Sequence, residues 1–232
     1  MARTKQSGPL TFATSEQFAK FVRVLWDELY WADVYYAIFK EGSRLAKRYE
    51  TAFQHAPFFL AYTLRAHCQT ALVYVHRLYD QNSESFNLRR FLLTVRKNPR
   101  VFEADAVRKR RINDPSADRL IKSIGPLDQE QLERDIEFCS DKNPKVRILK
   151  TWRDRIAFHK DKRELFRQKP FEQDYPLLFG DIDILIDRGF EILNRYSEYF
   201  DTTLRTRSLR EWKDMEFVFQ ALTHHPDFRP RV

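Results

Sequence analysis

The sequence is poor in cysteine and glycine, and both shortages narrow what the chain can be. Only two cysteines occur in 232 residues, and neither Cys68 nor Cys139 belongs to a C-x-x-C pair or to a Cys/His cluster with zinc spacing. A reducing environment is therefore expected, with no metal site. Only 5 glycines are present, which argues against a fold built on many tight β-turns. The composition favours helices.

Long apolar runs and phosphate-binding loops are also missing. The longest uncharged run, residues 51–64, is shorter than the roughly 20 residues that span a bilayer, so no membrane-spanning helix is expected. The first residues lack the apolar segment of a secretory signal, which favours a cytoplasmic location. We find no Gly-rich phosphate loop, no repeat and no convincing strand. No cofactor is expected.

Apolar and charged residues are both abundant. The chain is 43% hydrophobic, with 20 Phe, and 32% charged, which provides a core and a solvated surface. The length fits a single α-helical domain over residues 1–232, with a flexible leader at 1–14 and a loose tail at 223–232. A net charge of +8 attracts polyanions, although many proteins of this charge bind no nucleic acid.

Apolar residues recur with helical spacing along most of the chain. Gly42 and Ser43 are expected to weaken the first helix, and a short helical segment follows them. Asp128 is a candidate N-cap, and Asn143 followed by Pro144 is a strong helix start. The predicted helices cover residues 15–41, 57–80, 87–97, 127–139, 143–166, 178–204 and 211–222. These elements predict an all-α antiparallel bundle with a long final helix.

The stretch 98–126 has the least regular hydrophobic pattern and is predicted to be a basic insertion. It contains four adjacent cations, Arg108, Lys109, Arg110 and Arg111. One interpretation is that these side chains follow the phosphates of an RNA strand. The alternative is an ordinary solvated run of charge.

The stretch 150–161 combines a helical frame with a possible reaction centre. On a helix that continues to residue 166, Leu149 and Ile156 lie near the middle of one face, with Arg153 and His159 on its opposite flanks. The two residues are six positions apart, so they lie about 120° apart around the helix and about 9 Å apart along its axis. The two side chains should meet only if the 143–166 helix packs against a second copy about a twofold axis, so a homodimer is expected.

Arginine and histidine suffice to cleave RNA without a metal. Arg153 would stabilise charge on the phosphoryl oxygens, while His159 would move a proton at the 2′-OH or the leaving 5′-oxygen. Such an endoribonuclease leaves 2′,3′-cyclic phosphate ends. Arg155, Lys160 and Lys162 would add charge that holds phosphate. Spacing alone is weak evidence, because Arg48 and His55 match the same pattern by chance.

The order Arg153-Asp154, apolar residues, then His159-Lys160-Asp161 resembles the R-(N/D)-x(3–5)-H motif of the HEPN superfamily (higher eukaryotes and prokaryotes nucleotide-binding). Upstream, the segments 76–80 (HRLYD) and 88–92 (LRRFL) are similar to the matching helix pair of the abortive-infection U-type branch. The resemblance covers about residues 15–204.

This resemblance implies an antiparallel α-helical bundle, usually dimeric, with a composite cleft where the two motifs face each other. Many members are metal-independent endoribonucleases that act in antiviral defence or as toxins. By position, Arg153 and His159 would be the catalytic pair, and Asp154 would orient them. Asp161 stands where another branch has a tyrosine modified by a partner nucleotidyltransferase, so that route of inhibition is not expected.

Two other interpretations remain open. The chain could be a non-catalytic HEPN-type module that binds a nucleotide or a partner, such as one half of a toxin–antitoxin pair with an antitoxin or regulatory protein. It could also be an unrelated helical protein in which the charges of this helix form local ion pairs, as Arg155 and His159 would at i,i+4.

Overall fold

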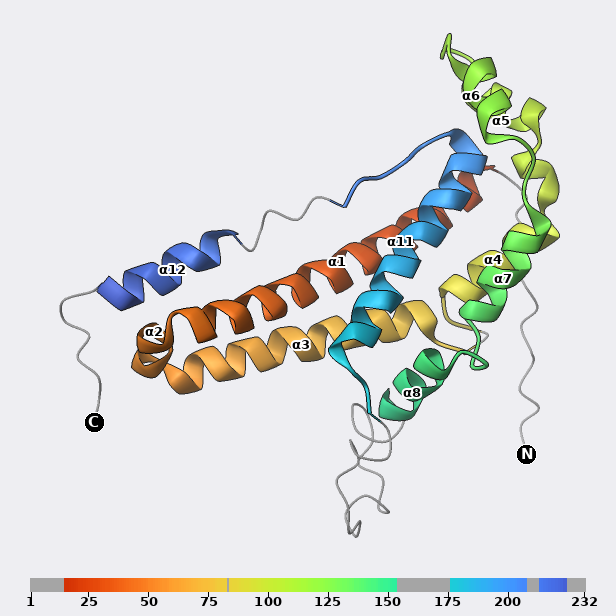
Figure 1. Cartoon of the computed structure of the whole chain (residues 1–232). Coiled ribbons are helices and arrows are strands. Elements are labelled where there is room, and N and C mark those ends of the chain that lie inside the picture. The colour runs from red at the N-terminus through yellow and green to blue at the C-terminus, as the bar shows by residue number, and fades with distance from the viewer. Residues whose placement is uncertain (1–14, 83, 154–175, 208–212, 225–232) are drawn as a thin grey trace, which may run out of the picture. The chain divides into compact units, whose positions relative to one another are not determined.

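The computed structural model describes residues 15–82, 84–153, 176–207 and 213–224. All regular elements in these ranges are helices (Figure 1), which confirms the predicted all-α fold. Within the same ranges, no helix is both long and apolar enough to cross a membrane.

Most of the helices agree with those that the sequence predicts. They are α1 (Ser15–Arg48), α2 (Glu50–His55), α3 (Pro57–Tyr79), α4 (Leu88–Lys97), the 3₁₀ helix η1 (Pro99–Phe102), α5 (Ala104–Arg110), α6 (Ala117–Ile124), α7 (Gln129–Phe138), α8 (Pro144–Trp152), α11 (Phe179–Asp201) and α12 (Lys213–His224).

The predicted caps of α7 and α8 are confirmed. The Asp128 side chain accepts a hydrogen bond from the backbone N–H of Gln131 at the start of α7. The Asn143 side chain accepts one from the backbone N–H of Lys145, with Pro144 at the first helical position. Each cap satisfies a backbone donor that has no partner inside its helix. The predicted continuation of the 143–166 helix beyond residue 153 lies outside the described residues.

Two stretches are more helical than the sequence predicted. Helix α1 runs through Gly42 to Arg48 instead of weakening near residue 41. A Cβ at Gly42 would overlap the Leu64 side chain and lie 2.9 Å from Met215 Sδ. The missing side chain therefore admits close neighbours, whose packing offsets the low helix propensity of glycine. The stretch 98–126, expected to be less regular, contains η1, α5 and α6.

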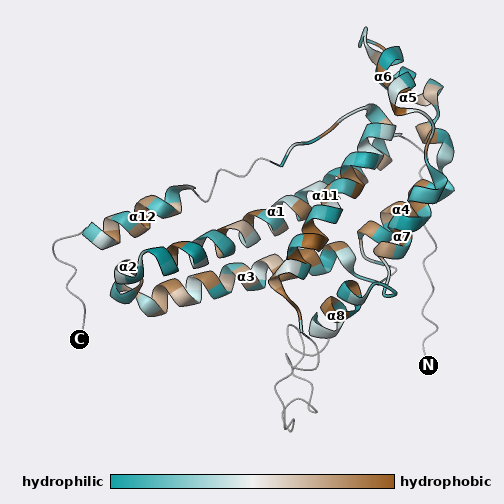
Figure 2. Cartoon of the chain, viewed as in Figure 1, coloured by the Kyte–Doolittle hydropathy of each residue, from teal (hydrophilic) through white to brown (hydrophobic). Residues whose placement is uncertain are grey.

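The chain forms two compact units. The first comprises residues 1–29 and 75–206, and the second comprises residues 30–74 and 207–232. In the first unit, the rings of Phe91, Phe102 and Phe200 surround the fully buried Phe18, with centroids 4.5–5.5 Å from its own. Figure 2 shows polar and apolar residues interleaved along α11, as in an amphipathic helix.

The second unit has its own small core. Its buried members are Leu45, Ala52, Leu60 and Phe219, which come from α1, α2, α3 and α12. Partly buried side chains such as Met215 and Leu222 pack against them. The predicted terminal helix is thus confirmed as α12. Of the predicted loose tail, Thr223 and His224 belong to this helix, and the rest lies outside the described residues, as does the predicted leader at 1–14.

Candidate functional site around Arg153

Helix α8 is held in place at both ends within the first unit. Near its start, Lys145 Nζ forms an ion pair with Asp181, in the first turn of α11. Arg153 follows its last residue, keeps helical backbone angles, and donates from Nη1 to Asp80 Oδ1 at 2.6 Å. Val146 and Leu149 are buried between these ends. The geometry therefore fixes where the Arg153 guanidinium lies.

Asp80 lies directly after α3 and accepts several hydrogen bonds. Its Oδ1 accepts from the Asn82 backbone N–H at 3.2 Å, and its Oδ2 accepts from Ser85 Oγ at 3.1 Å. Burial raises the pKa of Asp80, but the Asn82 hydrogen bond, the Arg153 charge and the Ser85 hydroxyl together bring its pKa below the usual value. Asp80 is therefore an ionised partner for Arg153, and their side chains are 15% and 25% exposed.

A polar tether brings the Asp80 loop to α8. Gln81 Nε2 donates to the carbonyl oxygens of Tyr79 at 2.8 Å and Cys139 at 2.9 Å. Cys139 ends α7, just before the turn into α8. Across this turn, Asn143 Nδ2 donates to the Phe138 carbonyl at 2.9 Å. The end of α3 and the start of α8 are thus connected through side-chain amides.

Sequence reasoning assigned no role to Asp80. The available signal was its position as the last residue of the segment 76–80, which carried part of the family resemblance. Asp80 lies after the last residue of α3 and before a polar loop. Helical spacing therefore does not predict which residue its side chain contacts.

Most of the predicted catalytic set lies outside the described residues. Asp154, Arg155, His159, Lys160 and Lys162 all fall in the range 154–175. Arg153 alone of that set is described, and its structural partner is Asp80. The meeting of Arg153 and His159 from two copies remains a prediction.

The three arginines of the basic run at 108–111 have partners inside the chain. Arg108 bonds Asp105 and Asp118, both at 2.7 Å. Arg110 and Arg111 point to the end of α11, where Arg110 Nε donates to the Phe200 carbonyl at 2.8 Å and Arg111 Nε to the Asp201 carbonyl at 2.6 Å.

Cations at a helix C-terminus stabilise its unpaired carbonyl groups. Arg110 and Arg111 thus attach α5 to α11. Phosphate binding by residues 108–111 stays a prediction.

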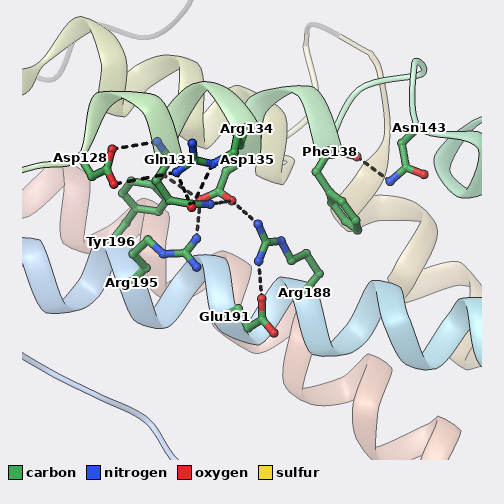
Figure 3. Close-up of polar contacts among 10 residues, drawn as sticks. All are labelled: Asp128, Gln131, Arg134, Asp135, Phe138, Asn143, Arg188, Glu191, Arg195 and Tyr196. Atoms are coloured by element: carbon green, nitrogen blue, oxygen red, sulfur yellow. Dashed lines mark hydrogen bonds and ion pairs between the residues drawn. The ribbon is translucent and has the colours of Figure 1, made fainter.

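A second polar cluster joins α7 to α11 (Figure 3). Asp135 on α7 is fully buried and accepts from Arg188 Nη2 at 2.6 Å, Arg195 Nη1 at 2.5 Å and Tyr196 Oη at 2.9 Å. Gln131 Nε2, one turn earlier, also donates to it at 2.9 Å. Burial, and then the charge of Asp135, raise the pKa of the Tyr196 phenol, so it stays protonated and donates. This cluster fixes α7, which leads into α8.

Within the described ranges, no group of three or more His, Cys, Asp or Glu side chains is placed to hold a metal ion.

The described residues form helices and no strands, which fits the all-α bundle of the HEPN class of modules. The family model HEPN_AbiU2, described as AbiU2, matches residues 15–216, and the chain belongs to this family. The match includes Asp80, Arg153 and His159, and it confirms the resemblance to the abortive-infection U-type branch. Neither a curated protein nor a solved structure matched the chain.

The Asp80–Arg153 pair predicts a pH-dependent contribution to stability. Because the folded pKa of Asp80 is lowered, the contribution is present above its unfolded pKa and is lost as pH falls through the folded value. Asp80→Asn should lower the free energy of unfolding near neutral pH by about 1–2 kcal/mol, and the difference should shrink below about pH 4.

Urea unfolding of both proteins across this pH range measures the difference. The matched control is Asp118→Asn, which alters a carboxylate that bonds Arg108 at 2.7 Å but is 76% exposed. If Asp80→Asn lowered the free energy of unfolding by the same amount at every pH, the result would contradict the electrostatic explanation.

Proposed function

We propose that this protein is an endoribonuclease that cleaves RNA without a metal ion, through Arg153 and His159 contributed by two copies of the chain. The observation that supports it is the ion pair at 2.6 Å in which Asp80 holds the Arg153 guanidinium, with that side chain a quarter exposed. Membership of a HEPN family and a net charge of +8 agree with an RNA substrate.

Asp80 would position Arg153 for catalysis. A guanidinium is rigid and planar and pairs well with phosphate oxygens, and Asp80 orients that of Arg153 through Nη1. In the proposed reaction the 2′-oxygen of RNA attacks the adjacent phosphorus, and the 5′-oxygen of the next nucleotide leaves. His159 transfers a proton at one of these oxygens, and Arg153 stabilises the charge on the phosphoryl group.

The proposed site needs two chains because one helix would present Arg153 and His159 about 120° apart. A twofold packing of the 143–166 helix would bring the arginine of one copy to the histidine of the other. Asp154 would orient this pair, and Arg155, Lys160 and Lys162 would hold the flanking phosphates. An activity of this kind suits antiviral defence by abortive infection, with an antitoxin or regulatory protein that restrains it.

Incubation of the purified full-length protein with tRNA or mRNA in EDTA tests this proposal. We expect fragments that end in 2′,3′-cyclic phosphate, together with a dimer in sedimentation. Intact RNA after prolonged incubation, or products that form only when a divalent metal is added, would contradict the mechanism. A strictly monomeric protein that still cleaves would contradict the composite site.

The ion pair with Asp80 also suits a second function, because it gives Arg153 a stabilising role that needs no reaction. In that case the protein is a HEPN-type module that binds a nucleotide or a protein partner. Harmless expression of the wild type in cells, with a change in binding but no reaction when Arg153 is replaced by alanine, would favour this alternative.

A further inference from the structure

Five ring side chains of the second unit form one connected set of ring contacts. On α1, the rings of Tyr30 and Trp31 lie 5.2 Å apart, and Trp31 lies 5.8 Å from Tyr35, one turn further along. Tyr35 in turn stacks on Tyr74 of α3, at 5.8 Å with 14° between the planes, and lies 5.6 Å from His67, two turns earlier on α3. We call these five residues the aromatic strip.

One end of the aromatic strip is open to solvent. Tyr30 is 40% exposed and Trp31 is 43% exposed, whereas Ala32 and Tyr36 beside them are buried. An exposed tryptophan that is already packed against other rings loses little side-chain freedom when a ligand covers it. The strip is thus a preformed surface for a flat ligand.

The strip itself carries no charge near neutral pH. Burial lowers the pKa of His67, which keeps its imidazole neutral. Asp33, on the same helix, is 1% exposed and bonded by Arg207, with Nε at 2.7 Å from its Oδ2. Binding here therefore depends on ring faces, and the net charge of +8 supplies the attraction for a polyanion.

We propose that the aromatic strip is a stacking site for the unpaired bases of single-stranded RNA, with Trp31 as its most exposed stacking ring. This inference rests on the proposed function only because it assumes that the ligand is RNA. Unstacked bases bind to the faces of Trp, Tyr and His rings, and such stacking tolerates any base sequence. A duplex hides its base faces and cannot use the site.

The test measures binding of fluorescently labelled RNA by anisotropy, using full-length His159→Ala protein as the parent so that the probe stays intact. The probes are an unstructured single strand of about 12 nucleotides, within the usual site sizes, and a duplex of the same length. Trp31→Ala should weaken single-strand binding roughly tenfold and leave duplex binding unchanged. Because stacking is not electrostatic, the ratio of the parent's single-strand affinity to that of Trp31→Ala should persist when salt is raised.

Two further variants separate stacking from general damage. Trp31→Phe keeps an aromatic face and should retain most of the binding. Phe59→Ala removes another exposed aromatic of the second unit, 70% exposed and outside the strip, and should bind as the parent does. The proposal would be overturned if Trp31→Ala and Phe59→Ala lost the same amount of single-strand affinity. It would also be overturned if Trp31→Ala lost the same amount of affinity for both probes.

The outcomes also separate this inference from the proposed function. If the wild type cleaves RNA but Trp31→Ala binds both probes as the parent does, the aromatic strip is overturned as an RNA site and the catalytic proposal stands. If no cleavage occurs but single-strand binding depends on Trp31, the aromatic strip stands and the catalytic proposal fails. A parent protein that binds neither probe overturns the aromatic-strip proposal.

Discussion

Replacement of His159 by alanine is expected to lower the rate of RNA cleavage by roughly 10²–10⁴-fold, because a positioned proton donor or acceptor contributes about that much. Arg153→Ala should lower it by roughly 10²–10³-fold, through lost stabilisation of phosphoryl charge. Arg153→Lys should recover only part of the rate, since an ammonium group cannot reproduce the planar geometry of a guanidinium. Single-turnover cleavage assays in EDTA measure all three.

The chain offers its own control for the histidine. Arg48 and His55 have the same spacing class as Arg153 and His159, but Arg48 is paired with Glu216 at 2.8 Å in the second unit. His55→Ala should therefore cleave at the wild-type rate. If His55→Ala and His159→Ala lowered the cleavage rate equally, His159 could not be assigned as the catalytic histidine.

Mixing the two inactive variants tests the composite site directly. A heterodimer of Arg153→Ala and His159→Ala chains contains one site with both side chains intact and one site with neither. Random exchange of subunits makes half of the dimers heterodimers, so about a quarter of the wild-type activity should return. A mixture that stays inactive despite exchange would show that the two residues do not act across chains.

Replacement of Asp135 by alanine is expected to cause the largest loss of stability, about 3 kcal/mol of unfolding free energy. Asp135 is fully buried and is bonded by Arg188, Arg195 and Tyr196. Its removal leaves two arginines, each about a quarter exposed, without their shared carboxylate. The cost arises mainly from these partly buried charges and from the hydroxyl that loses its acceptor.

Urea unfolding followed by circular dichroism measures this loss, with Asp105→Ala as the control. Asp105 also bonds an arginine, Arg108, at 2.7 Å, but it is 86% exposed, so water replaces the lost contact. The control should unfold as the wild type does. A loss for Asp135→Ala no larger than that of Asp105→Ala would contradict the view that the buried cluster fixes α7 against α11.

Much of the fold was predictable because helix formation depends on near neighbours along the chain. The spacing of apolar residues identified α3, α4 and α11, and Asp128 and Asn143 marked helix starts because a cap bonds the backbone two or three residues away. Gly42 shows the limit of such reasoning. Its low propensity argued for a weak helix, but the space that it leaves beside Leu64 and Met215 decides the outcome.

The candidate site was less predictable, since its contacts join distant parts of the sequence. Arg110 bonds the carbonyl of Phe200, 90 residues away, a contact that no local pattern indicates. Asp80 and Arg153 are separated by 73 residues, and no local pattern links them.

The sequence by itself determined most of the helices, two of their caps, the charge and the family motif, because each is a property of residues close together in the chain or of composition. The tertiary structure alone decided that Asp80 holds Arg153, that Asp135 gathers two arginines, and that Trp31 and Tyr35 stack with rings of α3. The physical reason is that an ion pair or a ring stack requires atoms within a few ångströms. The path of the folded chain sets those distances.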